Sequence, residues 1–210
     1  LVEEHSAFGF PVVVKPACLG SSVGVSLVRS HHELRRAVEQ AFLFDAHAMV
    51  ERYVDGVEVQ VAVLDGVPLG AIEVVPRDGI YNYLAKTREG RCELHMPARL
   101  SNTRYQGILT QARKAHEALG CHGITLVDML LSETGNEFIL EVNSLPALNP
   151  TAVLPKIAHA AGLDFGDLVE SVLETASLKS HGEAVQRAAE EPRIDLLGGE
   201  AHAVGAAGPN

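Results

Sequence analysis

The segment from residue 124 to residue 143 reads ITLVDMLLSETGNEFILEVN, and its pattern decides how the rest of the chain is interpreted. Two apolar, β-prone arms flank a polar turn that contains Gly135, which predicts a β-hairpin. A turn centred just after Thr134 would place Asp128 directly opposite Glu141. The sequence therefore predicts two carboxylates that face each other on neighbouring strands.

Facing carboxylates of this kind indicate a cation site. Like charges directly opposite each other on an antiparallel pair are destabilising, and Asn143 points to the same face as Glu141 because it follows two residues later. Oxygen atoms from Asp128, Glu141 and Asn143 form a ligand set suited to Mg²⁺, with Mn²⁺ as a substitute. The alternative is a solvated polar edge of a sheet.

The composition indicates a globular protein and disfavours two classes of partner. Of the 210 residues, 47% are hydrophobic, which is enough for one large domain or two small ones. The net charge of −10 argues against nucleic acid as a partner, because duplex binding relies on Lys and Arg side chains. No apolar stretch of about 18 residues occurs, so we expect no membrane span. Three scattered cysteines favour reduced thiols in a cytoplasmic protein.

Hydrophobic periodicity predicts the other regular elements. A Ser30–Glu33 capping box begins a helix whose apolar positions run to Phe42. We expect strands over residues 10–16, 25–28, 48–54, 57–64 and 69–75, and helices over 102–119 and 152–161 and from Phe165 to Leu173.

The turns and loops have their own signals. Asp-Gly pairs at 55–56 and 65–66 predict two tight hairpin turns. Residues 76–96 are polar and irregular, so we expect a mobile loop over a site. The composition after Lys179 predicts a disordered tail.

A small-residue loop, GSSVG at residues 20–24, lies between two predicted strands. Its glycines allow backbone N–H groups to approach an anion closely, and the hydroxyls of Ser21 and Ser22 add donors. Lys15 ends the preceding strand among apolar residues, where it needs an anionic partner or a path to solvent. A nucleotide phosphate would supply that partner, whereas an ordinary hairpin turn is the alternative.

Each of three further charged residues can be interpreted in two ways. Glu51 and Glu58 are either surface acids or acceptors for an adenine amino group and for ribose hydroxyls. Lys86, in the polar loop, is either an exposed lysine or a second cation that closes over phosphates.

Taken together and in order, these motifs resemble the ATP-grasp superfamily, and specifically the D-alanine–D-alanine ligases. The likeness runs from about residue 9 to residue 175 through PVVVKP, GSSVG, YNYLAK and the Asp128…Glu141-Val-Asn143 pattern. It implies an α+β, ATP-grasp fold in which two subdomains grip ATP between antiparallel sheets. Residues 1–50 would belong to the central subdomain and 51–178 to the C-terminal one, followed by the tail at 179–210.

The resemblance also implies a role for each site residue. Asp128, Glu141 and Asn143 would hold two Mg²⁺ ions, with Glu141 bridging them. Lys86 would contribute to catalysis from a closing loop, and the backbone N–H of Ala147 would form part of an oxyanion hole. The residues that would bind ATP are Lys15, Ser21, Ser22, Glu51, Tyr53, Val54, Glu58, Lys86 and Leu140.

The activity that the resemblance implies is ATP-dependent joining of a carboxylate to an amine. A small-molecule amino acid would form an acyl phosphate, and the amine of a second would displace phosphate to give a dipeptide for peptidoglycan precursors in the cytoplasm. We further expect that an N-terminal part is missing from this sequence, that homodimers form through it, and that residues 1–210 alone do not turn over substrate.

The sequence departs from the family on the amino-acid side. Leu126 stands where the family carries an arginine that stabilises the tetrahedral intermediate, Ala147 replaces a glycine, and Ala152 replaces a serine that binds the substrate carboxylate. Two alternatives therefore stay open: a related ligase for other amino acids in a specialised pathway, and a degenerate paralogue that binds Mg-ATP without chemistry. Retention of both metal carboxylates, Asp128 and Glu141, disfavours the second of these alternatives.

Overall fold

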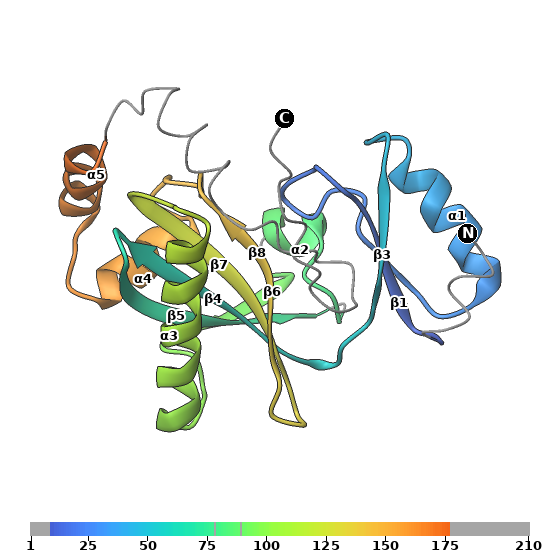
Figure 1. Ribbon diagram of the computed structural model, residues 1–210, viewed down its shortest axis with the longest axis horizontal. Coiled ribbons are helices and arrows are strands. Elements are labelled where there is room, and N and C mark those ends of the chain that lie inside the picture. The colour runs from blue at the N-terminus through green and yellow to red at the C-terminus, as the bar shows by residue number, and fades with distance from the viewer. Residues whose placement is uncertain (1–8, 78, 89, 177–210) are drawn as a thin grey trace, which may run out of the picture. The chain divides into compact units, whose positions relative to one another are not determined.

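The computed structural model describes residues 9–77, 79–88 and 90–176 of the chain (Figure 1). Contacts divide the chain into two units, Leu1–Thr175 and Ala176–Asn210, and all the elements below belong to the first unit. The predicted tail after Lys179 lies outside the described residues. Two antiparallel sheets and five helices confirm the α+β class in the part that is described.

The first sheet is three-stranded, in the order β2-β1-β3. Its central strand is the predicted apolar one, and Val12 and Val14 point into a small core with Leu34 of the covering helix. The bounds are β1 (Val12–Pro16), β2 (Ser26–Val28), α1 (His31–Ala41) and β3 (Ala48–Arg52).

The predicted capping box before α1 does not form, although the helix begins at the expected place. Both carboxylate oxygens of Glu33 accept hydrogen bonds, one from the Arg29 N–H at 2.9 Å and one from the Ser30 hydroxyl at 3.1 Å. Ser30 occupies the N-cap position, but its side chain accepts no capping hydrogen bond. The Glu33 side chain therefore binds the backbone just before the helix, and the N–H groups of Glu33 and Leu34 donate to the Ser30 carbonyl oxygen.

The second sheet is five-stranded, in the order β6-β5-β4-β7-β8. The predicted Asp65–Gly66 turn is present, with both residues at positive φ as a type I′ hairpin requires. The strands are β4 (Gly56–Leu64), β5 (Val67–Pro76), β6 (Cys92–His95), β7 (Ile124–Ser132) and β8 (Glu137–Asn143).

Opposite faces of this sheet carry different helices. Alternate β4 residues such as Val59 and Val61 pack with Ile108 of α3 (Asn102–Ala118). Ala62, on the other face, packs with Leu154 of α4 (Val153–Ala160). Leu168 of the last helix belongs to the same cluster. The part of this face that the helices leave uncovered forms a cavity wall.

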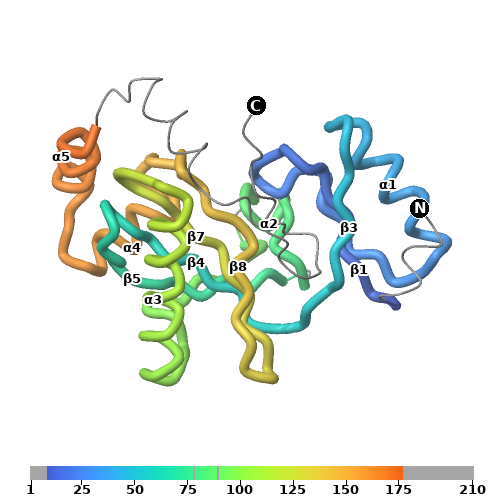
Figure 2. Tube along the Cα trace, viewed as in Figure 1, coloured from blue at the N-terminus to red at the C-terminus, as the bar shows by residue number. Residues whose placement is uncertain are grey.

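The prediction of a hairpin turn at Asp55–Gly56 is wrong. Strand β3 pairs with β1 in the first sheet, whereas β4 pairs with β5 and β7 in the second. Figure 2 shows the trace leaving β3 and running directly into β4. Gly56 is required for another reason: a Cβ atom there would clash with the carbonyl oxygen of Leu131 on β7. The glycine permits close strand approach and does not form a turn.

The expectation of an irregular loop over residues 76–96 is also wrong in part. Strand β5 continues to Pro76, and the segment contains the five-residue helix α2 (Tyr83–Thr87) and the edge strand β6. The side chain of Asn82 accepts a hydrogen bond from the Ala85 N–H at 3.0 Å and so caps the helix. Lys86 therefore lies on a short helix and not in an irregular loop.

The buried face of α3 includes a histidine near its C-terminal end. His116 is buried and its Nδ1 lies 2.9 Å from the Thr125 hydroxyl of β7, whereas Leu119 is exposed. Burial lowers the pKa of His116. In the last helix, α5 (Phe165–Glu174), Leu168 is buried and Leu173 is exposed.

None of the helices within the described residues is long and apolar enough to span a bilayer.

Candidate functional site

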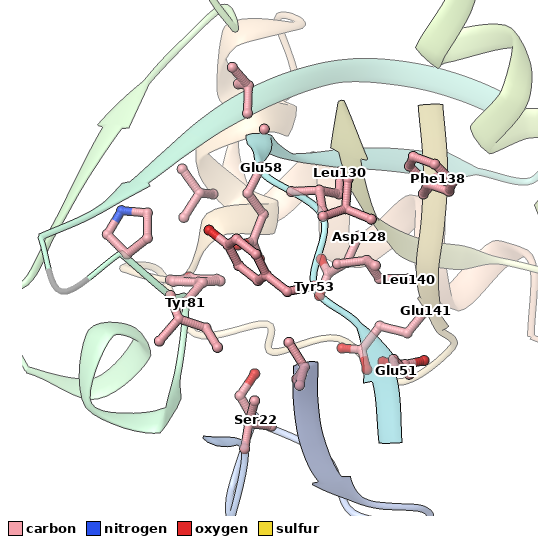
Figure 3. Close-up of a pocket in the computed structure, with 18 of the residues that line it drawn as sticks. Ser22, Glu51, Tyr53, Glu58, Tyr81, Asp128, Leu130, Phe138, Leu140 and Glu141 are labelled. Atoms are coloured by element: carbon pink, nitrogen blue, oxygen red, sulfur yellow. The ribbon is translucent and has the colours of Figure 1, made fainter. Parts of the chain in front are cut away.

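A cavity of about 640 Å³ lies between residues of the two sheets (Figure 3). This volume falls in the range of small-molecule and cofactor sites. Nearly all of the residues expected to bind ATP line the cavity: Lys15, Ser22, Glu51, Tyr53, Val54, Glu58, Lys86 and Leu140. Asp128 and Glu141 line it as well, so the cavity brings the expected nucleotide and metal residues together.

The hairpin that carries the carboxylates reaches its register in two steps. Its loop is centred on Thr134, since the Ser132 N–H donates to the carbonyl oxygen of Asn136, and this pairing alone would set Asp128 opposite Leu140. A bulge then leaves Leu140 without a cross-strand partner, and Asp128 pairs with Glu141. The predicted Asp128–Glu141 pair is therefore confirmed, although the turn itself is centred half a residue earlier than predicted.

Asp128 is held by a hydrogen bond and an ion pair. Its Oδ1 accepts a hydrogen bond of 2.5 Å from Nε2 of Gln60, the residue opposite it on β4. Its Oδ2 lies 3.8 Å from Nζ of Lys86, and both side chains are largely buried. Burial raises the pKa of Asp128; Lys86 opposes the rise and Glu141 adds to it.

Glu58 adds a third carboxylate to the same wall of the cavity. Burial, reinforced by the negative charge of Asp128, raises the pKa of Glu58 to about 8. Lys86 opposes this shift. The nitrogen of Lys86 also lies 4.9 Å from the ring centre of Tyr81. Lys86 therefore lies close to two carboxyl groups, those of Asp128 and Glu58. A divalent cation would neutralise the negative charge that Lys86 does not balance.

On the side of the first sheet, Lys15 and Glu51 form an ion pair of 2.8 Å. Both side chains remain partly exposed to the cavity, at 25% and 40%. The two residues lie diagonally on neighbouring strands, β1 and β3, two residues apart in the ladder, since Glu51 is opposite Val13. An arriving phosphate group would therefore have to draw Lys15 away from a carboxylate.

The GSSVG loop adopts an unusual backbone. Ser21 and Ser22 have φ of 57° and 54°, the left-handed region that non-glycine residues rarely visit. Two successive residues of this kind form a type I′ turn, in which the Val23 N–H donates to the Gly20 carbonyl oxygen at 3.4 Å. Ser22 lines the cavity, whereas Ser21 is not among its lining residues.

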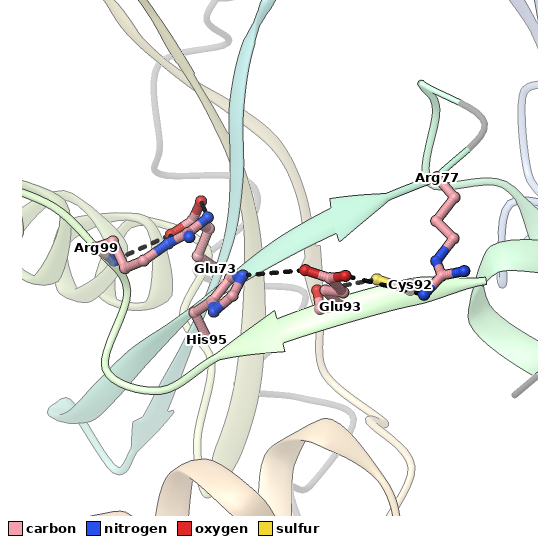
Figure 4. A network of polar contacts seen from close by, with 6 residues as sticks. All are labelled: Glu73, Arg77, Cys92, Glu93, His95 and Arg99. Atoms are coloured by element: carbon pink, nitrogen blue, oxygen red, sulfur yellow. Dashed lines mark hydrogen bonds and ion pairs between the residues drawn. The ribbon is translucent and has the colours of Figure 1, made fainter. Parts of the chain in front are cut away.

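A salt bridge at the cavity wall was not singled out in the sequence. Glu73 of β5 is buried and accepts three hydrogen bonds from Arg99, at 2.8 Å from Nε, 2.8 Å from Nη2 and 3.1 Å from the backbone N–H (Figure 4). Arg99 lowers the pKa of Glu73 through these bonds. The signal in the sequence was a glutamate within an apolar strand, which requires a partner.

The expected metal ligand Asn143 and two positions of the amino-acid side, Ala147 and Leu126, lie outside the lining of the cavity. Asn143 is paired with Leu126 on β7, and its Oδ1 accepts a hydrogen bond of 3.0 Å from the Leu145 N–H. Ala147 is exposed in the loop after β8. Leu126 is buried in the core with Leu154 of α4.

The donors fit Mg²⁺ in kind. Two facing carboxylates and the nearby Asn143 amide supply oxygen ligands, which Mg²⁺ prefers. Within residues 9–77, 79–88 and 90–176, no three His, Cys, Asp or Glu side chains form a cluster that could hold a metal by themselves. An all-protein cage is not required, because Mg²⁺ commonly binds through one or two carboxylates together with substrate phosphates.

Sequence comparison decides the family. The profile of a family described as "D-ala D-ala ligase C-terminus" matches residues 1–174. The chain belongs to this family. The resemblance to D-alanine–D-alanine ligases is therefore confirmed.

Individual relatives of the ligase family agree with this assignment. The D-alanine–D-alanine ligase of Citrifermentans bemidjiense is 47% identical over 169 residues, covering 80% of this chain and 55% of that protein. The D-alanine–D-alanine ligase of Geobacter sulfurreducens is 45% identical over 177 residues, covering 84% of this chain and 56% of that protein. The chain thus spans a little over half the length of these curated relatives.

Solved structures of ligases confirm the ATP-grasp fold. The VanG D-Ala:D-Ser ligase from Enterococcus faecalis matches with a TM-score of 0.74 and 29% identity, over 82% of this chain and 52% of that one. The D-alanine–D-alanine ligase from Bacillus anthracis complexed with ATP matches with a TM-score of 0.69 and 26% identity, over 90% and 59%.

The raised pKa of Glu58 generates a prediction about stability. An acid whose pKa is raised by folding contributes stability below its unfolded pKa and loses it as pH rises through the folded value. Between pH 4.5 and about pH 8, the metal-free protein should therefore lose stability relative to Glu58→Gln. We expect a difference on the order of 5 kcal/mol at pH 8.5, measured by urea unfolding at several pH values.

Glu133→Gln, in the exposed hairpin loop, is the matched control and should follow the wild-type profile. A constant difference between wild type and Glu58→Gln at all pH values would contradict this account of the buried carboxylate.

Proposed function

We propose that the protein is an ATP-dependent carboxylate–amine ligase that joins two D-alanine molecules. One observation carries the proposal: a bulged hairpin sets Asp128 opposite Glu141 on a cavity that also holds Lys15 and Lys86. Two cations and two facing carboxylates suit a nucleotide triphosphate with its metal, since phosphoryl transfer relies on positioning and charge neutralisation. The family membership and the named relatives support the same activity.

Each residue has a proposed task in nucleotide binding. Lys15 would leave Glu51 and contact the phosphates, and the Ser21–Ser22 backbone would donate to them. Glu51 would then accept from the adenine amino group, while Glu58 would accept from the ribose. Tyr53, Val54 and Leu140 would enclose the adenine.

The metal and the reacting groups complete the proposed site. Asp128, Glu141 and Asn143 would hold two Mg²⁺ ions, which neutralise charge on the phosphates of bound ATP. Lys86 would leave its ion pair with Asp128 and contact the phosphoryl group that is transferred. The backbone N–H of Ala147 would donate to the oxygen of the attacked acyl group.

Other features of the proposal concern the whole protein. A cytoplasmic site of action accords with three free cysteines among the described residues. The division into subdomains at residues 1–50 and 51–178 and the association into a homodimer stay predictions.

Amino-acid-dependent phosphate release from Mg-ATP by the full-length parent protein tests the proposed activity, because we expect residues 1–210 alone not to turn over substrate. We expect release with D-alanine, formation of D-alanyl-D-alanine by mass, and loss of both in Asp128→Asn, because the metal loses a charged ligand. Arg113→Gln, on the exposed side of α3, is a control that should retain activity. Nucleotide binding without release for any D- or L-amino acid would refute ligase chemistry, and the absence of Mg-ATP binding would refute the nucleotide site.

A second candidate is a ligase for a different pair of amino acids. The observation that favours it is Leu126, which is buried among apolar side chains at the position where the resemblance leads us to expect an arginine. A leucine cannot stabilise an oxyanion, and loss of one such donor typically costs about 10²–10³ in turnover. A structural relative described as a D-Ala:D-Ser ligase supports variation of the acceptor on this fold.

Leu126→Arg separates the two candidates. If the second is correct, this variant should raise D-alanyl-D-alanine formation at least about tenfold over wild type, because it restores the cation that the resemblance leads us to expect at this position. Leu126→Met is the size-matched control, and thermal unfolding verifies that both variants fold. Efficient wild-type dipeptide formation that Leu126→Arg lowers would exclude the second candidate.

A further inference from the structure

Gln60 is a polar side chain in an otherwise apolar position. It lies in the middle of β4, a central strand flanked by β5 and β7, and it is 4% exposed. Its chain neighbours Val59 and Val61 are completely buried. Packing alone would favour an aliphatic residue here, because burial of an amide costs free energy unless hydrogen bonds replace its contacts with water.

The amide of Gln60 is satisfied on one side only. Nε2 donates to Oδ1 of Asp128 at 2.5 Å, across the β4–β7 pair in which the two residues are directly opposite. Oε1 is buried and has no hydrogen-bond partner among the described residues. The Gln60 side chain thus donates to Asp128 while its own carbonyl oxygen stays buried without a hydrogen bond. A buried unsatisfied acceptor is unfavourable, and its presence here indicates a role beyond packing.

The hydrogen bond leaves the two oxygens of Asp128 in different situations. Oδ1 points to Gln60, behind the cavity wall, since Gln60 is not among the lining residues. Oδ2 points toward Lys86 at the cavity. Rotation about the last torsion of a free aspartate is broad, so the bond from Gln60 selects one orientation of the carboxylate.

We propose that Gln60 is a positioning residue that fixes the Asp128 carboxylate so that Oδ2 is the oxygen presented to a divalent cation. This inference rests on the proposed function of Asp128 as a metal ligand. Gln60 touches neither metal nor substrate; it acts through Asp128. Groups that orient a ligand in this way typically contribute 10- to 100-fold to metal affinity.

The test is a titration of the full 210-residue chain with Mn²⁺ at pH 8.5 in the presence of a non-hydrolysable ATP analogue, whose phosphates supply the remaining metal ligands. The electron paramagnetic resonance signal of free Mn²⁺ is followed, and a titration of the analogue without protein is subtracted. Gln60→Met keeps the length and burial of the side chain but removes the donor. We expect its Mn²⁺ affinity to be about 10- to 100-fold lower than that of wild type. Gln60→Asn, whose amide is one methylene too short to reach Oδ1, should show the same loss and serves if Gln60→Met does not fold.

Thr125→Val is the matched control for loss of a buried hydrogen bond away from the site, because Thr125 contacts His116 at 2.9 Å. It should lower the midpoint of thermal unfolding and leave Mn²⁺ affinity at the wild-type value, which separates a structural effect from a positioning one. Mn²⁺ affinity within twofold of wild type in folded Gln60→Met or Gln60→Asn would overturn the inference while leaving the metal site intact. Failure of wild type to bind Mn²⁺ would overturn the metal assignment of Asp128 and, with it, the role of Gln60.

Discussion

Repulsion between two facing carboxylates is the constraint on which the rest of the site depends. Asp128 and Glu141 are directly opposite on adjacent strands, and Asp128 is largely buried. Such a pair is unfavourable by itself, so the surrounding side chains have to compensate. Gln60 donates to one oxygen of Asp128, and Lys86 supplies a positive charge near the other. The same compensation leaves the site ready for a divalent cation, which would neutralise both carboxylates at once.

The position of the pair follows from the architecture of the five-stranded sheet. One face is filled by α3, and part of the other by α4, so polar groups on that second face collect where helix cover ends. Glu58 and Gln60 lie on this face of β4 because they alternate with the buried Val59 and Val61. The bulge at Leu140 then brings Glu141 opposite Asp128. A sheet without the bulge would have paired Asp128 with a leucine.

Much of this was predictable from local patterns, and the errors have physical causes. The hairpin and its Asp128–Glu141 pair follow from alternation and turn chemistry, but the bulge does not, because the sequence alone does not reveal which residue will be extruded. Asp55–Gly56 has the signal of a turn, yet the glycine serves close approach to β7, a long-range contact that local rules cannot detect. Gln60 was not singled out because its role depends on which residue lies opposite it. The ligand roles of the site residues stay predictions.

A double-mutant cycle between Asp128→Asn and Glu141→Gln, measured by urea unfolding with and without saturating Mg²⁺ and a non-hydrolysable ATP analogue, tests the central claim most directly. Without ligand, the account predicts an unfavourable coupling free energy of about 0.2–1 kcal/mol between the two carboxylates. With ligand, the coupling should change sign, because both carboxylates then bind the same cation and the bound metal stabilises the folded state. A coupling of zero under both conditions would contradict the claim that these two residues form one cation site.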